Sequence, residues 1–140
     1  MKRRVFLVLV TLAASLPLLS CVVTSHDYCV EVSCDQFRDN SHHSGEFEVE
    51  VGDKVRVELC SNPTTGFEWT QKMSGDTVLR EEDRDFVEAE DEGVVGAAGK
   101  DLWTFEAIDK GTAEVSMEYS QPWDGGIKAE WTYTLTVTVK

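Results

Sequence analysis

Residues 131–139 read Trp-Thr-Tyr-Thr-Leu-Thr-Val-Thr-Val, so that every second side chain is large and apolar. A period of two is typical of a β-strand with one face in the core and the other in solvent. Shorter stretches repeat this alternation at residues 28–32, 47–51, 55–59, 67–69, 103–105 and 113–119. No useful window after the N-terminal 20 residues has a helical period. The pattern predicts a single all-β domain, a sandwich or a barrel, without internal repeats.

Two of these stretches lie close together in the chain. Residues 47–51 and 55–59 flank the dipeptide Gly52-Asp53, which is typical of a tight turn. We therefore expect the two stretches to pair as a β-hairpin.

Residues 81–92 contain eight acidic side chains and one basic one, Arg84. Their spacing fits no EF-hand loop, so we interpret them as a solvated edge strand that charge protects from aggregation rather than as a calcium site.

The overall composition also limits the function. The 140 residues include 13 Lys or Arg and 26 Asp or Glu, which gives a formal net charge of −13. Such an excess of acid repels phosphate backbones, so we expect no nucleic-acid partner and favour neutral or basic partners. A hydrophobic content of 41% is enough for one globular domain, which we expect to be a monomer.

The N-terminus has the pattern of an export signal. Lys2, Arg3 and Arg4 precede an apolar run, residues 5–16, that is too short to span a membrane permanently. Residues 18–21, Leu-Leu-Ser-Cys, resemble the lipobox of bacterial lipoproteins. This resemblance implies a signal peptide over residues 1–20, a lipid on Cys21 and a tether over residues 21–27, and it leaves residues 28–140 for the folded domain. The protein would then be exported and lipid-anchored to the cell envelope, outside the cytoplasmic membrane. The alternative is an ordinary secretory signal cut elsewhere, for instance after residues 13–15.

If Cys21 carries lipid, three cysteines remain: Cys29, Cys34 and Cys60. In an oxidising compartment, one disulfide and one free thiol is the simplest outcome. Cys29 and Cys34 lie about 16 Å apart if both belong to one strand, which is too far for a disulfide. We favour Cys34–Cys60 because Cys29 lies nearer the tether, although strand alternation argues against this pairing and leaves Cys29–Cys60 open.

The sequence gives little indication of a metal site, a cofactor or a catalytic centre. It contains no Cys-x-x-Cys motif, and His26, His42 and His43 have no recognised ligand spacing. It also lacks the common nucleophile, metalloprotease and phosphate-loop motifs. We therefore expect no metal, no cofactor and no enzymatic activity.

Three connections between the expected strands have unusual compositions. In residues 62–67, Asn-Pro-Thr-Thr-Gly-Phe, Pro63 fixes one φ and Gly66 permits a positive φ, which places the two threonines at the tip of a stiff turn. A stiff turn loses little entropy on docking. Residues 96–99, Gly-Ala-Ala-Gly, allow another backbone to approach closely. Residues 121–123, Gln-Pro-Trp, place a large aromatic ring on a turn, as in many interface anchors.

In this order, the three motifs resemble those of the chagasin family of cysteine protease inhibitors. The resemblance covers roughly residues 46–140. It implies that residues 28–140 form a chagasin-like inhibitor domain, an immunoglobulin-like β-sandwich with Greek-key topology. It further implies that the first motif enters the active-site cleft of a papain-like cysteine protease while the other two brace it. The implied protease-binding residues are Asn62, Pro63, Thr64, Thr65, Gly66, Phe67, Gly96, Ala97, Ala98, Gly99, Gln121, Pro122 and Trp123.

The sequence departs from the family pattern in two places. Gln121 stands where the family usually has Arg, which replaces a charge-assisted contact to the protease with a neutral hydrogen bond. Residues 27–44 are also longer than the family core requires. The alternative function is an envelope lipoprotein whose immunoglobulin-like domain binds another protein or a glycan through the same loops.

Overall fold

The computed structural model describes residues 26–89 and 97–140, which form two β-sheets, a short α-helix and a one-turn 3-10 helix. The elements are β1 (Asp27–Val32), α1 (Cys34–Asp39), β2 (His42–Val49), β3 (Lys54–Ser61), η1 (Pro63–Thr65), β4 (Glu68–Gly75), β5 (Leu79–Val87), β6 (Gly99–Ala107), β7 (Gly111–Ser120) and β8 (Trp131–Val139). Among the residues so described, no helix is long and apolar enough to cross a bilayer.

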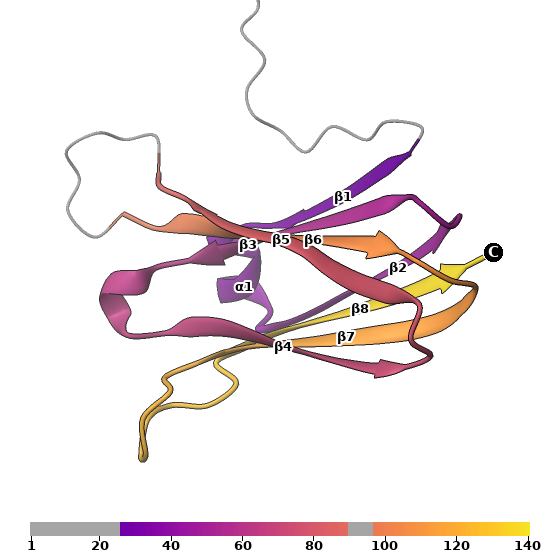
Figure 1. Cartoon of the computed structure of the whole chain (residues 1–140). Helices are drawn as coiled ribbons and strands as arrows, with labels where there is room; N and C mark the ends of the chain where they lie inside the picture. The colour runs from indigo at the N-terminus through magenta and orange to yellow at the C-terminus, as the bar shows by residue number, and fades with distance from the viewer. Residues whose placement is uncertain (1–25, 90–96) are drawn as a thin grey trace, which may run out of the picture.

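The first sheet has the strand order β1-β3-β6-β5 and the second sheet the order β2-β8-β7-β4. Figure 1 shows the two sheets facing each other, with α1 between them. Among the described strand pairs, only β1-β3 and β2-β8, each at one edge of its sheet, are parallel; the others are antiparallel. Most connections cross from one sheet to the other, whereas β5-β6 and β7-β8 pair with their neighbour in sequence. The predicted all-β, immunoglobulin-like sandwich is therefore confirmed.

The predicted hairpin over residues 47–59 is wrong. β2 pairs with β8 in the second sheet, whereas β3 pairs with β1 and β6 in the first sheet. The turn between them carries the chain from one sheet to the other, and the Asp53 carboxylate closes this turn by accepting a hydrogen bond of 2.9 Å from the Glu50 N–H. Both strands turn one apolar face to the shared core. The resulting alternation of apolar and polar residues is the same whether two strands pair as a hairpin or lie in different sheets.

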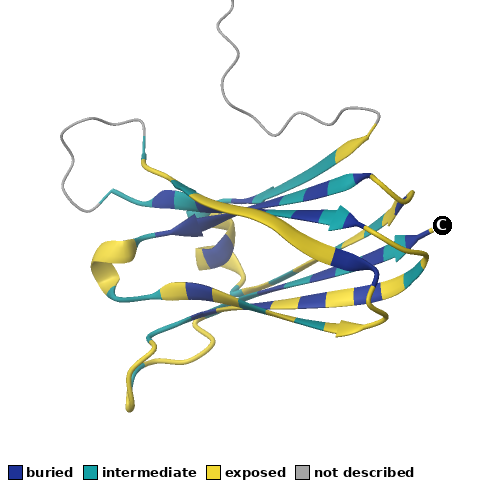
Figure 2. Cartoon of the chain, viewed as in Figure 1, coloured by how far each residue is buried: buried dark blue, intermediate teal, exposed yellow. Residues whose placement is uncertain are grey.

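The core consists of the inward-facing side chains of both sheets. Figure 2 shows buried and exposed residues alternating along β7, as the period of two predicts. Trp69, Phe105 and Leu135 are completely buried. Burying a side chain of this size stabilises a fold by about 1.5–3 kcal/mol, so the strand patterns alone supply much of the driving force.

Strand β5 lies at an edge of the first sheet, and most of its acidic side chains are exposed. The interpretation of this segment as a solvated edge strand is confirmed for residues 81–87. A β-bulge lies between Glu81 and Asp83. Such irregularities discourage further strand pairing at a sheet edge.

Helix α1 was not expected from the sequence. It begins with a capping box, in which the Ser33 hydroxyl accepts from the Gln36 N–H and the Gln36 side chain accepts from the Ser33 N–H. Its one buried side chain, Phe37, is 1% exposed. Six residues are too few to produce a visible helical period, so only the cap could have predicted this helix.

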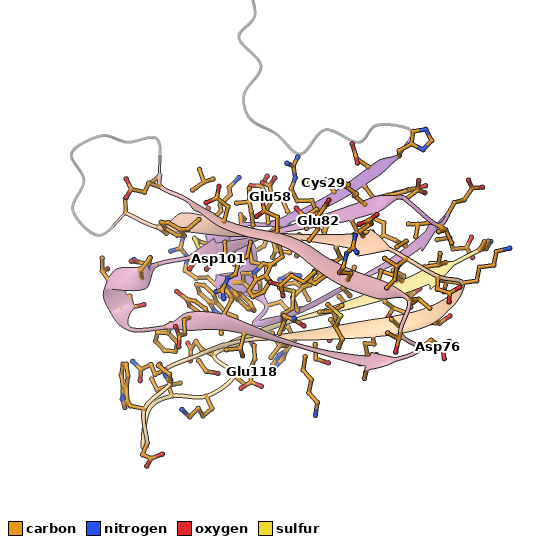
Figure 3. All side chains as sticks on the ribbon, in the orientation of Figure 1. Cys29, Glu58, Asp76, Glu82, Asp101 and Glu118 are labelled. Carbon is orange, nitrogen blue, oxygen red and sulfur yellow. A yellow bond between two sulfur atoms is a disulfide. The ribbon has the colours of Figure 1, made fainter. Side chains whose placement is uncertain are left out.

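The Cys34–Cys60 disulfide joins α1 to the end of β3, and the predicted pairing is confirmed. The strand assumed for Cys34 is wrong, because this residue begins the helix. That also removes the conflict with strand alternation. Cys29 is disulfide-bonded as well, so the free thiol expected there is wrong. Cys29 lies beside Glu58 on the outer face of the first sheet, with the sulfur 3.8 Å from a carboxylate oxygen (Figure 3).

The predicted signal peptide, the predicted lipid site at Cys21 and nearly all of the predicted tether fall outside the described residues. Backbone pairing begins close to the predicted domain start at residue 28. Strand β1 begins at Asp27, and the His26 carbonyl accepts a hydrogen bond from the Lys54 N–H.

Candidate functional site

Two connections and the described ends of a third lie at the same end of the sandwich, on the left in Figure 1. We call them the first loop (residues 62–67), the second loop (residues 88–98) and the third loop (residues 121–130). Strand registers bring their ends together, since Ser61 pairs with Gly99 across the first sheet, and Glu68 pairs with Ser120 across the second. The structure therefore gathers the described residues of all three sequence motifs at one end.

The first loop is a compact turn closed by its own side chains. Residues 63–65 form the 3-10 helix η1, and Asn62 caps it by accepting from the Thr64 N–H at 3.2 Å and from the Thr64 hydroxyl at 2.7 Å. The Thr65 hydroxyl donates to the Asn62 carbonyl at 2.6 Å. Gly66 ends the turn with a φ of 77°, a conformation that favours glycine. Thr64 and Thr65 remain exposed at the tip.

The base of the first loop is held by aromatic side chains. The Tyr119 hydroxyl accepts from the Asn62 N–H at 2.8 Å, and the Trp69 indole N–H donates to the Cys60 carbonyl at 2.9 Å. Phe67 stacks on Tyr119 with the ring centroids 5.2 Å apart. Phe67 is half-buried, and its ring packs at the base of the first loop. Sequence reasoning missed the role of Tyr119, because nothing in a local pattern indicates a bond to a residue 57 positions away.

The third loop lies directly against the first. A Cβ atom added to Gly66 would be only 2.4 Å from the Trp123 ring, so the indole rests on the glycine backbone. The other side of this ring is open, and Trp123 is 50% exposed. Ile127, in the same loop, is 52% exposed. The two loops together therefore present an apolar surface beside the exposed hydroxyls of the first loop.

The Gln121 side chain bonds within the protein. Its amide N–H donates to the Thr65 carbonyl at 3.4 Å, and its amide oxygen accepts from the Ile127 N–H at 2.9 Å. This residue therefore links the first loop to the third. The Lys128 ammonium group donates to the carbonyls of Gln121 and Trp123 and holds the third loop closed. Lys128 is a further residue that the sequence motifs did not reveal.

The second loop is described only at its ends. Gly96 lies outside the described residues, whereas Ala97 and Ala98 are half-buried and Gly99 begins β6. A Cβ atom at Gly99 would lie 2.2 Å from the Val87 carbonyl oxygen, so glycine allows β5 and β6 to approach closely there. Close by, burial alone would lower the pKa of Lys100, but its contacts with Glu31 and Glu58 outweigh burial and raise that pKa.

The described part of this end holds no catalytic or metal-binding arrangement. Its loop residues include no histidine and no cysteine, and the described chain contains no group of three or more His, Cys, Asp or Glu side chains placed to hold a metal ion. The site consists of a stiff uncharged turn, an exposed indole and the internal hydrogen bonds that hold both in place. Such a surface is suited to docking against another macromolecule.

These features define the class of fold, an immunoglobulin-like β-sandwich with loops gathered at one end. The sequence of residues 48–137 matches the family described as Chagasin family peptidase inhibitor I42. The chain therefore belongs to the chagasin family, as the three motifs predicted, and it is an inhibitor rather than an enzyme.

Individual relatives agree with this assignment. Chagasin of Trypanosoma cruzi is 31% identical over 90 residues, which cover 61% of this chain and 80% of that protein. Amoebiasin-2 of Entamoeba histolytica is 25% identical over 92 residues, which cover 66% of this chain and 75% of that protein.

Solved structures show the same fold. The cysteine protease inhibitor EhICP2 from Entamoeba histolytica superposes with a TM-score of 0.62 at 19% identity, over 84% of this chain and 100% of that one. PbICP-C, solved in complex with falcipain-2, superposes with a TM-score of 0.56 at 15% identity, over 81% of this chain and 99% of that one.

Proposed function

We propose that this protein is a reversible inhibitor of papain-like cysteine proteases that blocks the active-site cleft with its three loops. The observation that carries the proposal is the contact between Trp123 and Gly66, which joins the first and third loops into one exposed wedge. The relatives support the target class, since EhICP2 is a cysteine protease inhibitor and PbICP-C was solved bound to falcipain-2.

The mechanism follows from the shape and chemistry of the wedge. A papain-type site is an open groove that holds a reactive thiolate and a histidine. The first loop would enter this groove with Thr64 and Thr65 foremost and exclude substrate and water. Its backbone is closed into a 3-10 turn by hydrogen bonds to Asn62, so it does not offer the extended segment that a protease cleaves. Trp123 would stack beside the cleft, and the second loop would lie along the opposite rim.

A titration against papain at fixed substrate concentration tests this function. We expect competitive, reversible inhibition at or below micromolar concentration. Absence of inhibition at that concentration would favour the alternative, in which the same loops of an envelope protein bind another protein or a glycan. Binding of the protein to catalytically blocked papain is then measured as well. It shows whether a protein that fails to inhibit also fails to bind.

Substitutions at the tip of the first loop should show how much its shape and its internal hydrogen bonds each contribute to inhibition. The double substitution Thr64→Glu/Thr65→Glu should weaken inhibition by about a hundredfold, because two carboxylates would enter a closed cleft without partners. Thr64→Val/Thr65→Val keeps the side-chain shape but removes both hydroxyl bonds to Asn62, and should weaken inhibition by about tenfold. Inhibition constants of the folded variants are the measurement, and equal values for all three proteins would contradict the insertion of this loop.

The internal bonds of Gln121 should matter for affinity. Gln121→Met keeps the length of the side chain but removes both polar atoms, and we expect inhibition to weaken about fivefold to tenfold. Gln121→Arg keeps a donor for the Thr65 carbonyl and should lose less. Gln71→Met, which removes a bond to Glu81 in the middle of β4, is the matched control and should leave the inhibition constant unchanged. A larger loss in the control would contradict a specific role for Gln121.

We also propose that the protein is lipid-anchored through Cys21 at the cell envelope, as the lipobox pattern predicts. The wild-type protein should enter the detergent phase of a detergent partition, whereas Cys21→Ala should stay uncleaved or remain in the aqueous phase. Peptide mass mapping provides a second test. The lipid competes with the disulfide of Cys29, because Cys34 and Cys60 pair with each other and Cys21 is the only other cysteine of the chain. A thioether and a disulfide cannot share one sulfur atom. Recovery of Cys21 in a disulfide with Cys29 would therefore contradict the anchor, whereas a lipidated Cys21 peptide and a Cys29 thiol would support it.

A further inference from the structure

Helix α1 precedes the family-matched segment, residues 48–137, yet it is covalently joined to the inhibitory end. Its first residue, Cys34, forms the disulfide with Cys60, and only Ser61 separates Cys60 from the first loop. We propose that α1 and this disulfide are a positioning element that sets the geometry of the first loop. The inference rests on the proposed function and adds Cys34, Phe37 and Cys60 to the residues on which inhibition depends.

The topology explains why the first loop needs such an element. The loop begins at the end of β3 in the first sheet and ends at β4 in the second sheet. Its two ends are therefore not joined by a strand ladder, as they would be in a hairpin. The distance between them depends on the spacing of the two sheets at this end. The element that packs between the sheets at this end therefore sets the distance between the two ends of the first loop.

Helix α1 fills that space. It lies between the sheets in Figure 1, and its Phe37 is 1% exposed. The Phe37 ring lies 5.5 Å from the ring of Trp69 in β4 and 4.9 Å from that of Trp131 in β8, measured between centroids. The disulfide adds a tie to β3 in the opposite sheet. The helix thus holds both sheets at the base of the first loop.

A row of aromatic rings continues from the helix to the loop itself. Phe37 stacks on Trp131, Trp131 stacks on Tyr119 at 5.0 Å, and Tyr119 stacks on Phe67 at 5.2 Å. Phe67 directly follows Gly66, on which the Trp123 ring rests. Tyr119 also bonds to the Asn62 N–H. A shift of Phe37 would therefore reach both ends of the first loop through direct contacts.

The disulfide makes this element sensitive to thiols. A dithiol reductant would transfer two electrons and two protons, so that Cys34 and Cys60 become thiols and the reductant forms its own disulfide. Cys60 is buried, whereas Cys34 is half-buried and offers the accessible sulfur. Breaking the bond leaves Phe37 held only by packing, and the first loop should then sample more conformations.

The test compares wild type with Cys34→Ala/Cys60→Ala in the otherwise unchanged chain. We expect the inhibition constant for papain to rise about tenfold, mainly through faster dissociation. Amide hydrogen exchange of Thr65 and Gly66, which donate to Asn62 and Pro63, should accelerate, while amides in the middle of β7 and β8 keep their protection. Wild type treated with dithiothreitol should approach the variant, measured with papain that has been activated and then desalted.

Val78→Ala is the matched control. Val78 is 2% exposed and lies next to Asp76 and Gly111, at the end away from the loops, where Figure 3 labels Asp76. This substitution should lower the melting temperature but leave the inhibition constant and the Thr65 exchange rate unchanged. An equal loss of inhibition in Val78→Ala would mean that the effect is one of global stability, and it would overturn the inference.

The outcomes distinguish this inference from the proposed function. If wild type inhibits papain and the double alanine variant inhibits within about twofold of it, the positioning role is wrong and the function stands. If wild type does not inhibit at all, the function fails, and the exchange rates of Thr65 and Gly66 still decide whether α1 positions the loop. Should the double variant not fold, Phe37→Leu replaces it with the same expected pattern.

Discussion

Replacing Trp123 with alanine should weaken inhibition of a papain-like protease by about thirtyfold or more, equivalent to about 2 kcal/mol. The indole rests on Gly66 on one side and is open on the other, which is the arrangement of an aromatic anchor awaiting a partner. Because the ring is half exposed, its removal should change the free energy of unfolding far less than the free energy of binding. Inhibition constants and denaturant unfolding measure the two quantities separately.

Val51→Ala is the control for this prediction. Val51 is 51% exposed, close to the 50% of Trp123, but it lies in the turn between β2 and β3, away from the three loops. It should lose no inhibition. If Trp123→Ala inhibits as well as wild type, the wedge mechanism is wrong and the alternative binding function gains support.

Gly66→Ala should weaken inhibition by a comparable factor, about tenfold to a hundredfold, for a different reason. The added methyl group would lie 2.4 Å from the Trp123 ring, so the ring must move. The residue would also keep a φ of 77°, which costs a non-glycine residue about 1–2 kcal/mol. The first effect acts on the binding surface and the second on the stability of the fold.

Gly52→Ala separates the two effects. Gly52 has a φ of 96°, and a Cβ atom there would meet nothing within 4 Å. This variant should therefore lose stability much as Gly66→Ala does but inhibit like wild type. A loss of inhibition in both variants would show that backbone strain, and not the displaced indole, is responsible. The intrinsic tryptophan fluorescence, to which Trp123 and three other tryptophans contribute, gives an independent measure. It should change only in Gly66→Ala, where the Trp123 ring must move.

The extent to which the sequence predicted the site differs from loop to loop. The stiff turn at residues 62–66 was predictable, because Pro63 fixes its own φ wherever it occurs and Gly66 allows the positive φ that closes the turn. The bond that links Gln121 to the first loop was not, because it joins this side chain to Thr65, 56 positions earlier in the chain. A motif that suggests contact with a protease cannot reveal that both polar atoms already have partners within the protein.

The wrong hairpin has a similar cause. Alternation along residues 47–59 correctly identified two strands, since the period of two depends only on which face of each strand is buried. Which strand pairs with which depends on the whole sandwich, in which β2 joins β8 and β3 joins β6. Helix α1 escaped notice because its six residues are held by Phe37 packing and a disulfide rather than by helical propensity.

By itself, the sequence determined the strands, the all-β class, the stiff first loop and the family, because each of these follows from local spacing or from ordered short motifs. Only the tertiary structure decided the strand partners, the position of α1 and the contact of Trp123 with Gly66. These depend on side chains far apart in the chain that meet only when the two sheets close over a shared core. The Cys34–Cys60 pairing was predicted, but the spacing argument behind it assumed a strand at Cys34, and it was the turn into α1 that brought Cys34 to Cys60.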